Sequence, residues 1–279
     1  MGKKVLIINY DICNGCYNCQ IACKDEHCAN DWSPIAKPQP DTGQFWNKIN
    51  DNVRGQVPKV FVTYEHSICQ HCDEAPCIDA CKEKAIYKRD DGIVIIDPAK
   101  CRGNQMCIEA CPYENVIYYN DDLLISQKCT FCAHLIDDGW EEPRCVDACP
   151  TGAFTFGDED DPKIKELIAR AEPLKAGLDV KPRVYYIGLP KRFIAGALYD
   201  KEEDECAEGV KVTATCASCD CGETFETVTD SYGHFWLRNL KECEYLLTFE
   251  KEGYLTQKFG PVDVTEKDIN IGDVALWKE

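Results

Sequence analysis

The feature that most constrains this chain is a short segment, repeated four times before residue 150, in which two cysteines end a run as C-x3-C. The four copies are nearly identical: C-Q-I-A-C, C-I-D-A-C, C-I-E-A-C and C-V-D-A-C. Fifteen of the 21 cysteines belong to the runs that these segments close. The runs are Cys13, Cys16, Cys19 and Cys23; Cys69, Cys72, Cys77 and Cys81; Cys101, Cys107 and Cys111; Cys129, Cys132, Cys145 and Cys149. This clustering predicts metal-binding thiolates.

The spacing of the first run, C-x2-C-x2-C-x3-C, is that of bacterial ferredoxins. Three closely spaced thiolates bind one cubane, and the fourth reaches a neighbouring cluster, so such runs work in pairs. A disulfide framework is typical of short secreted chains, whereas this chain has 279 residues. Zinc sites usually pair C-x2-C arms and do not repeat one run four times. The pattern therefore indicates iron–sulfur clusters.

The charge of the chain disfavours nucleic-acid binding. There are 49 acidic and 31 basic residues, which give a net charge of −18. Clusters held by four thiolates add further negative charge, and phosphates repel such a surface. Solubility and a basic face on a partner protein both explain the acidity, and the sequence leaves both open.

The sequence predicts a cytoplasmic protein. No run of about eighteen apolar residues is present, so we expect no membrane-spanning helix. Residues 1–11 contain only V-L-I-I as an apolar stretch, too short for a signal peptide, and we expect them to form the first strand. Export on a partner that carries its own signal remains an alternative.

The cysteine runs define a first domain over residues 1–157. We expect two β-hairpins within it, one at A-I-Y-K-R-D-D-G-I-V-I-I-D-P, with Asp91-Gly92 as a two-residue turn, and one at N-V-I-Y-Y-N-D-D-L-L-I. Residues 30–66 form a long insertion with Trp32, Phe45 and Trp46. Long loops are usually functional, so we expect a partner-facing surface there, with local packing as the alternative.

A second domain follows a helical linker at residues 158–190. Asp161 and Pro162 predict the start of a helix that extends to about residue 176. Over residues 191–279, short alternating segments such as V-K-V-T-A-T-C, H-F-W-L-R and Y-L-L-T-F predict an antiparallel β-sandwich. The inward faces are predicted to carry Val210, Val212 and Ala214; Phe235 and Leu237; and Tyr245, Leu247 and Phe249. The fold class is therefore α+β.

The second and fourth runs, C-x2-C-x4-C-x3-C and C-x2-C-x12-C-x3-C, resemble the iron–sulfur subunits of the molybdopterin oxidoreductase family, that of dimethyl sulfoxide reductase. The segments D-G-I-V-I-I-D-P, Q-K-C-T-F-C-A-H-L and K-P-R-V-Y-Y extend the resemblance to small subunits of pyrogallol–phloroglucinol transhydroxylases. T-D-S-Y-G-H-F and K-E-G-Y resemble transthyretin-like or carboxypeptidase-regulatory-like modules. The resemblance implies a duplicated ferredoxin-like iron–sulfur domain followed by a transthyretin-like β-sandwich.

The resemblance also implies which cysteines share a cluster. Three [4Fe-4S] clusters are expected on Cys13, Cys16, Cys19 and Cys149; on Cys129, Cys132, Cys145 and Cys23; and on Cys69, Cys72, Cys77 and Cys111. A fourth is expected on Cys101, Cys107 and Cys81, with Asn104 where the family has its remaining ligand. An amide is a poor ligand for iron beside thiolates. A three-iron cluster, a four-iron cluster with an unusual ligand and an empty site are the alternatives, and we favour occupancy.

The function implied is that of an electron-transfer subunit in a molybdenum or tungsten enzyme. A large molybdopterin-containing partner would perform the catalysis on polyhydroxylated aromatics, by transhydroxylation or by reductive dehydroxylation, and a further electron donor is compatible with this. The sequence provides no catalytic residue and no other cofactor motif of its own. The alternatives are a stand-alone polyferredoxin, clusters that are mainly structural in a redox-neutral transhydroxylase, and an independent adhesion or carbohydrate role for the β-domain, which we disfavour.

Several residues outside the ligand sets remain open. His71 and Lys128, which adjoin cysteines of the runs, are candidates for tuning a cluster, or else are solvated surface side chains. Six cysteines lie outside the runs: Cys28, Cys206, Cys216, Cys219, Cys221 and Cys243. We expect the last four to lie at one end of the sandwich, as free or partly paired thiols first, disulfides second and a zinc site third.

Overall fold

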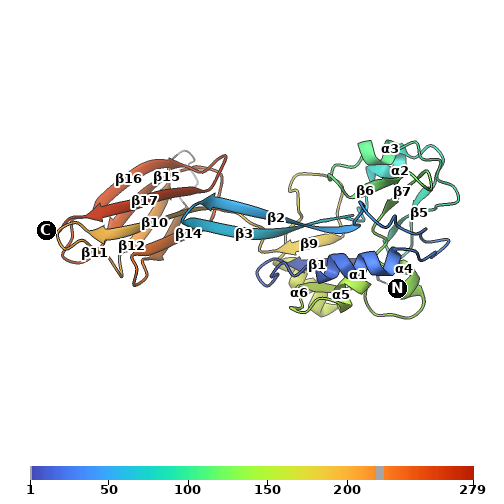
Figure 1. Ribbon diagram of the computed structural model, residues 1–279, viewed down its shortest axis with the longest axis horizontal. Coiled ribbons are helices and arrows are strands. Elements are labelled where there is room, and N and C mark those ends of the chain that lie inside the picture. The colour runs from blue at the N-terminus through green and yellow to red at the C-terminus, as the bar shows by residue number, and fades with distance from the viewer. Residues whose placement is uncertain (1, 218–222) are drawn as a thin grey trace. The chain divides into compact units, whose positions relative to one another are not determined.

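The structure is a computed structural model that describes residues 2–217 and 223–279. The chain divides into two compact units (Figure 1). The first comprises Met1–Asp51 and Tyr64–Leu189, and the second comprises Asn52–Thr63 and Pro190–Glu279. The described residues include no helix that is long and apolar enough to cross a membrane.

The first unit contains short helices and small sheets. Its helices are α1 (Asn18–His27), α2 (Pro76–Ala80), α3 (Met106–Glu109), α4 (Ala133–Asp137), α5 (Arg144–Asp147) and α6 (Pro162–Ala169). Its strands are β1 (Lys4–Asn9), β4 (Ile86–Lys88), β5 (Val94–Ile96), β6 (Ile117–Asn120), β7 (Ile125–Lys128), β8 (Phe154–Asp158) and β9 (Val184–Ile187). The predicted first strand is β1, and its apolar residues 5–8 are buried.

A three-stranded sheet joins the N-terminal strand of this unit to two strands from its C-terminal part. β1 is its central strand and pairs antiparallel with β8 and parallel with β9. The sequence assigned residues 158–190 to a linker, but β9 within that range is part of this sheet. The predicted helix begins as expected, because the Asp161 side chain accepts hydrogen bonds from the amides of Lys163 and Ile164, but it ends at Ala169.

Both predicted hairpins of the first unit are present. β4 pairs antiparallel with β5, and β6 pairs antiparallel with β7. The prediction of a two-residue turn at Asp91-Gly92 is wrong, because β4 ends at Lys88 and β5 begins at Val94. The amide of Arg89 donates to the carbonyl of Ile93 and closes a wider loop. Asp91 stabilises that loop by accepting from the amide of Ile93.

A third hairpin belongs to both units. It is formed by β2 (Asn47–Gln56) and β3 (Lys59–Ile68), and its tip, residues 52–63, is part of the second unit. The sequence placed all of it in the first domain. The Arg54 guanidinium donates 2.8 Å hydrogen bonds to both carboxylate oxygens of Asp268 and one to the carbonyl of Lys191. The Asp268 side chain is only 3% exposed, so this pair is buried within the second unit.

The second unit is a sandwich of two four-stranded sheets (Figure 1). One contains β10 (Arg192–Asp200), β11 (Glu205–Cys206), β14 (His234–Leu240) and β17 (Ile269–Leu276). The other contains β12 (Lys211–Cys216), β13 (Thr224–Val228), β15 (Glu244–Glu250) and β16 (Gln257–Asp263). All eight residues predicted to face inward are at most 1% exposed, which confirms their alternation. β17 runs parallel to β10, so the sandwich is not purely antiparallel.

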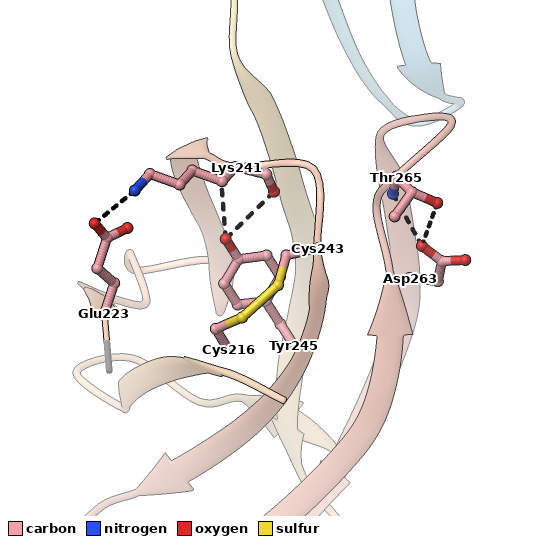
Figure 2. Close-up of a disulfide and its surroundings, with 7 residues drawn as sticks. All are labelled: Cys216, Glu223, Lys241, Cys243, Tyr245, Asp263 and Thr265. Atoms are coloured by element: carbon pink, nitrogen blue, oxygen red, sulfur yellow. Dashed lines mark hydrogen bonds and ion pairs between the residues drawn. A yellow bond between two sulfur atoms is a disulfide. The ribbon is translucent and has the colours of Figure 1, made fainter. Parts of the chain in front are cut away.

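A disulfide joins Cys216, at the end of β12, to Cys243, just before β15 (Figure 2). The aromatic ring of Tyr245 lies beside it, and its hydroxyl hydrogen-bonds with the backbone of Lys241. Free or partly paired thiols were the first expectation and disulfides the second, and the structure pairs these two thiols in a disulfide. Cys219 and Cys221 lie outside the described residues. Disulfides are more common in oxidising compartments than in the cytoplasm.

We predict that the disulfide survives in the native protein. Alkylation without reductant, followed by mass spectrometry, should leave Cys216 and Cys243 unlabelled. Cys206 is exposed and unpaired and should be labelled, which provides a control on the same molecule. Full labelling of Cys216 and Cys243 would contradict the pairing.

We also predict that Arg54→Met destabilises the sandwich by about 3–5 kcal/mol, because the Asp268 carboxylate is then buried without its partner. Hydrogen exchange of peptides from β10 and β17 in the full chain measures this change. Lys211→Met is the matched control, because the ion pair of Lys211 with Glu226 is about half exposed on both sides and should contribute little. Equal effects of the two substitutions would argue against the prediction.

Candidate metal centres

Each C-x3-C segment lies on a short helix or at its end. Cys19 and Cys23 are on α1, and the corresponding pairs are on or next to α2, α3 and α5. Residues four positions apart lie on the same face of a helix, so each pair presents two thiols in the same general direction. The sequence repeat is therefore also a repeat of local structure.

The loops before α1 and α3 repeat the same backbone turn. Gly15 and Gly103 have φ values of +67° and +65°, and Tyr17 and Gln105, two residues later, have 62° and 60°. A Cβ at Gly15 would lie 2.3 Å from the ring of Tyr64. A glycine is required there both by the left-handed backbone and by the close approach of that ring.

Cysteines from distant runs lie close together in four groups. Burial raises the pKa of most of these thiols. The charge of a nearby thiol raises the pKa further, so each such influence identifies a pair of neighbouring cysteines. Group 1 is Cys13, Cys16, Cys19 and Cys149; group 2 is Cys23, Cys129, Cys132 and Cys145; group 3 is Cys69, Cys72, Cys77 and Cys111; group 4 is Cys81, Cys101 and Cys107.

The same influences order the groups in a line. The charge of Cys19 in group 1 raises the pKa of Cys23 and Cys145 in group 2. The charge of Cys69 in group 3 raises the pKa of Cys129 in group 2. The charge of Cys107 in group 4 raises the pKa of Cys77 and Cys111 in group 3. Each group is therefore next to the one that follows it.

Burial favours the protonated form of several of these thiols. It raises the pKa of Cys19, Cys72, Cys77 and Cys132 to about 12 and that of Cys111 to about 11. Cys149 is the exception: burial opposes ionisation, but hydrogen bonds from Thr151 and from backbone amides lower its pKa overall. The amide of Ala153, for example, lies 3.3 Å from its sulfur.

The thiols of group 3 line a small hollow. Two polar groups that line it, the Nε2 atom of His71 and the hydroxyl of Tyr113, are buried and have no hydrogen-bond partner among the described residues. Buried polar atoms are normally paired. Four thiols and two unpaired polar groups around one space fit a cofactor that accepts hydrogen bonds.

The four groups do not have the geometry of a single-ion site. Over the described residues, no three or more histidine, cysteine, aspartate or glutamate side chains converge closely enough to hold one metal ion. Thiolates on one zinc are each about 2.3 Å from it and therefore almost touch. In an iron–sulfur cluster, by contrast, each thiolate binds a separate iron.

Asn104 does not complete group 4 as a thiol would. Its amide nitrogen donates a 2.6 Å hydrogen bond to the carboxylate of Glu83, and its amide oxygen accepts from the amide of Met106. The side chain is exposed. Both polar atoms are thus engaged with groups other than the thiols of Cys81, Cys101 and Cys107.

Three buried histidines adjoin the first three groups. Burial lowers the pKa of His27 to about 3 and that of His66 to about 4, and it lowers the pKa of His71 well below its usual value. His66 lies 3.7 Å from the sulfur of Cys13, and His27 lies 3.8 Å from that of Cys132. Sequence reasoning missed His27 and His66, because both are distant in sequence from the thiols that they contact.

His71 and Lys128 are not solvated surface residues. His71 is fully buried, and Lys128 is 2% exposed. The Lys128 ammonium donates to the carbonyls of Val94 and Cys129. Its charge lowers the pKa of thiols in groups 2 and 3, including Cys129 and Cys77, although burial dominates both. The alternative reading of these two residues as surface side chains is wrong.

The aromatic residues of the insertion pack mainly inside the first unit. Trp46 is 1% exposed, with its ring 4.5 Å from that of His27. Trp32 stacks on His134 at 4.4 Å. The Lys24 ammonium lies 5.3 Å from the centre of the Phe45 ring. Trp46 therefore packs locally, whereas Trp32 and Phe45 are only partly buried, and the partner-facing surface over residues 30–66 stays a prediction.

Comparison with known families matches both parts of the chain. Residues 60–159 match the 4Fe-4S dicluster domain. Residues 194–276 match the carboxypeptidase regulatory-like domain. The second match agrees with the transthyretin-like sandwich that the sequence predicted.

Several curated proteins are similar over most of their length. The pyrogallol hydroxytransferase small subunit of Pelobacter acidigallici is 32% identical over 99% of this chain and 100% of its own length. The arsenate respiratory reductase iron–sulfur subunit ArrB of Shewanella sp. strain ANA-3 is 31% identical over 65% of this chain and 94% of its own. A sulfite dehydrogenase subunit of Allochromatium vinosum is 33% identical over 69% of this chain and 85% of its own.

Proposed function

The chain belongs to the family of iron–sulfur electron-transfer subunits of molybdenum enzymes, and we propose that it carries electrons to or from a molybdopterin-containing catalytic partner that acts on polyhydroxylated aromatics. The observation that carries this proposal is that neighbouring cysteine groups share buried cores: groups 1 to 3 contribute cysteines to one core, and groups 3 and 4 to another. When bound, iron–sulfur clusters accept and release one electron each. Residues of this chain hold successive clusters next to one another and thus define a path.

Groups 1, 2 and 3 are proposed to hold one [4Fe-4S] cluster each, through the cysteines that define them. Group 4 is proposed to hold a three-iron cluster, since Asn104 provides no thiol and its amide contacts Glu83. Support for a duplicated ferredoxin-like arrangement comes from the repeated turns at Gly15 and Gly103. It also comes from the exchange of closing cysteines, because Cys149 joins the first run while Cys23 joins the fourth.

The aromatic substrate is proposed from the full-length similarity to the pyrogallol hydroxytransferase small subunit. Transhydroxylation needs no net electrons, so the clusters would then prime the metal of the partner or act structurally. Reductive dehydroxylation consumes two electrons and needs the whole path and an external donor. We favour the use of the path, because the four groups follow one another in series.

We predict about fifteen irons per chain, four in each of three clusters and three in the fourth. Iron analysis and electron paramagnetic resonance of the purified complex test this. Asn104→Cys should add a thiol to group 4, abolish the oxidised three-iron resonance and raise the content to about sixteen irons. Gln105→Cys, one residue further along, is the matched control and should leave the resonance unchanged. About twelve irons without a three-iron resonance would mean that group 4 is empty.

We further predict that the chain co-purifies with a pterin-containing subunit and that the complex consumes a reductant when it turns over a catechol. The measurement is oxidation of a low-potential dye that depends on the aromatic substrate. Turnover without net dye oxidation would favour a redox-neutral transhydroxylase. Purification as a free chain with intact clusters would favour a stand-alone polyferredoxin and contradict the proposal.

A further inference from the structure

Groups 1, 2 and 3 share one feature: each has one buried histidine beside its cysteines. The histidines are His66, His27 and His71, respectively, and none is more than 2% exposed. They come from β3, α1 and the loop before α2. Three different elements thus place the same chemical group at three separate sites.

The proton of His71 has a defined position. The amide of Val94 donates a 3.0 Å hydrogen bond to Nδ1, so Nδ1 carries the lone pair and the neutral ring holds its proton on Nε2. That Nε2 atom has no hydrogen-bond partner among the described residues. The ring is held by stacking on Phe131, with centroids 3.8 Å apart. It lines the hollow that contains the four thiols of group 3.

His66 and His27 approach sulfur directly through the same ring nitrogen. Nε2 of His66 is 3.7 Å from Sγ of Cys13, and Nε2 of His27 is 3.8 Å from Sγ of Cys132. On the other side of the His66 ring, Nδ1 lies 3.3 Å from the amide oxygen, Oδ1, of Asn47, which can only accept a hydrogen bond. The Asn47 amide nitrogen is buried and has no hydrogen-bond partner among the described residues. Exchanging the amide oxygen and nitrogen by a 180° turn pairs that nitrogen with Nδ1, and the neutral ring then holds its proton on Nε2.

Group 4 lacks this feature. The other two histidines are engaged elsewhere: His134 contacts Glu26 and Trp32, and His234 is on β14 of the second unit. The sulfur atoms of Cys101 and Cys81 accept instead from the backbone amides of Ser126 and Ala85, at 3.4 and 3.3 Å. The incomplete group is therefore also the one without a histidine.

We propose that His66, His27 and His71 each donate an Nε2–H hydrogen bond to a sulfur of the cluster in their group and thereby raise its reduction potential. This inference rests on the proposed function. Reduction adds one electron, and hydrogen bonds to sulfur stabilise the added negative charge. The interaction is a hydrogen bond, and no proton is transferred. The histidines are positioning and tuning residues, and the iron ligands remain the thiolates.

Spectroscopy of the unaltered complex provides the first test. Protein labelled with ¹⁵N-histidine is reduced stepwise, and the hyperfine coupling of the clusters to ¹⁵N is recorded. Three four-iron signals should each show a coupled histidine nitrogen, and the three-iron signal of group 4 should show none. Four-iron signals without any such coupling would overturn the inference and leave the proposed function intact. Absence of four-iron signals would overturn both.

Paired substitutions at His71 provide the second test. His71→Asn keeps an acceptor near the position of Nδ1 for the amide of Val94 but does not reach the position of Nε2. His71→Gln reaches that position with an N–H donor. We expect the Asn variant to shift the reduction equilibrium of the group 3 cluster about tenfold towards the oxidised state, about 59 mV for one electron. The Gln variant should recover most of the shift.

The corresponding variants identify the other two clusters. His66→Asn and His27→Asn should each lower the potential of one further cluster and remove its ¹⁵N coupling. His234→Asn in the sandwich is the control and should change neither. Iron content measured on every sample separates tuning from cluster loss. Equal potentials in wild type, His71→Asn and His71→Gln, at full iron content, would refute the proposal for group 3.

Discussion

The mutual burial of cysteine thiols from opposite ends of the first unit is the interaction on which the rest of that unit depends. Cys149, at the end of the fourth run, lies with the thiols of the first run, and Cys23 lies with those of the fourth. Cys19, Cys23, Cys129 and Cys145 belong to the main apolar core. Bound iron would therefore link segments more than 100 residues apart in the sequence and couple cofactor binding to folding.

The same burial accounts for the polar groups around the thiols. A thiolate inside an apolar core is unfavourable unless cations or hydrogen-bond donors surround it. The ammonium of Lys128 lies beside groups 2 and 3, and backbone amides reach the sulfur atoms of Cys149, Cys81 and Cys101. These donors are supplied by elements that also order the groups in a line. Folding, cofactor binding and electron transfer therefore use the same contacts.

The second unit contains none of the four groups, yet the chain enters it twice. Residues 52–63 leave the first unit between the first and second cysteine runs, and residues 190–279 follow the fourth. The buried pair of Arg54 and Asp268 joins these two passages within the sandwich. Residues 52–63 thus have a structural role in the sandwich, which a reading by position in the sequence does not reveal.

The sequence alone determined the cysteine runs, the inward faces of the sandwich and both short hairpins. These features depend on local spacing, because a helix repeats every 3.6 residues and a strand every two. The assignment of cysteines to shared clusters came from family resemblance and stays a prediction. Only the tertiary structure decided that His27 and His66 contact sulfur, that Lys128 is buried, and that Trp46 packs inside. Such contacts join residues from distant elements, and no periodicity along the chain records them. The structure also decided that the hairpin tip belongs to the sandwich, because a single buried ion pair between residues 214 positions apart fixes it there.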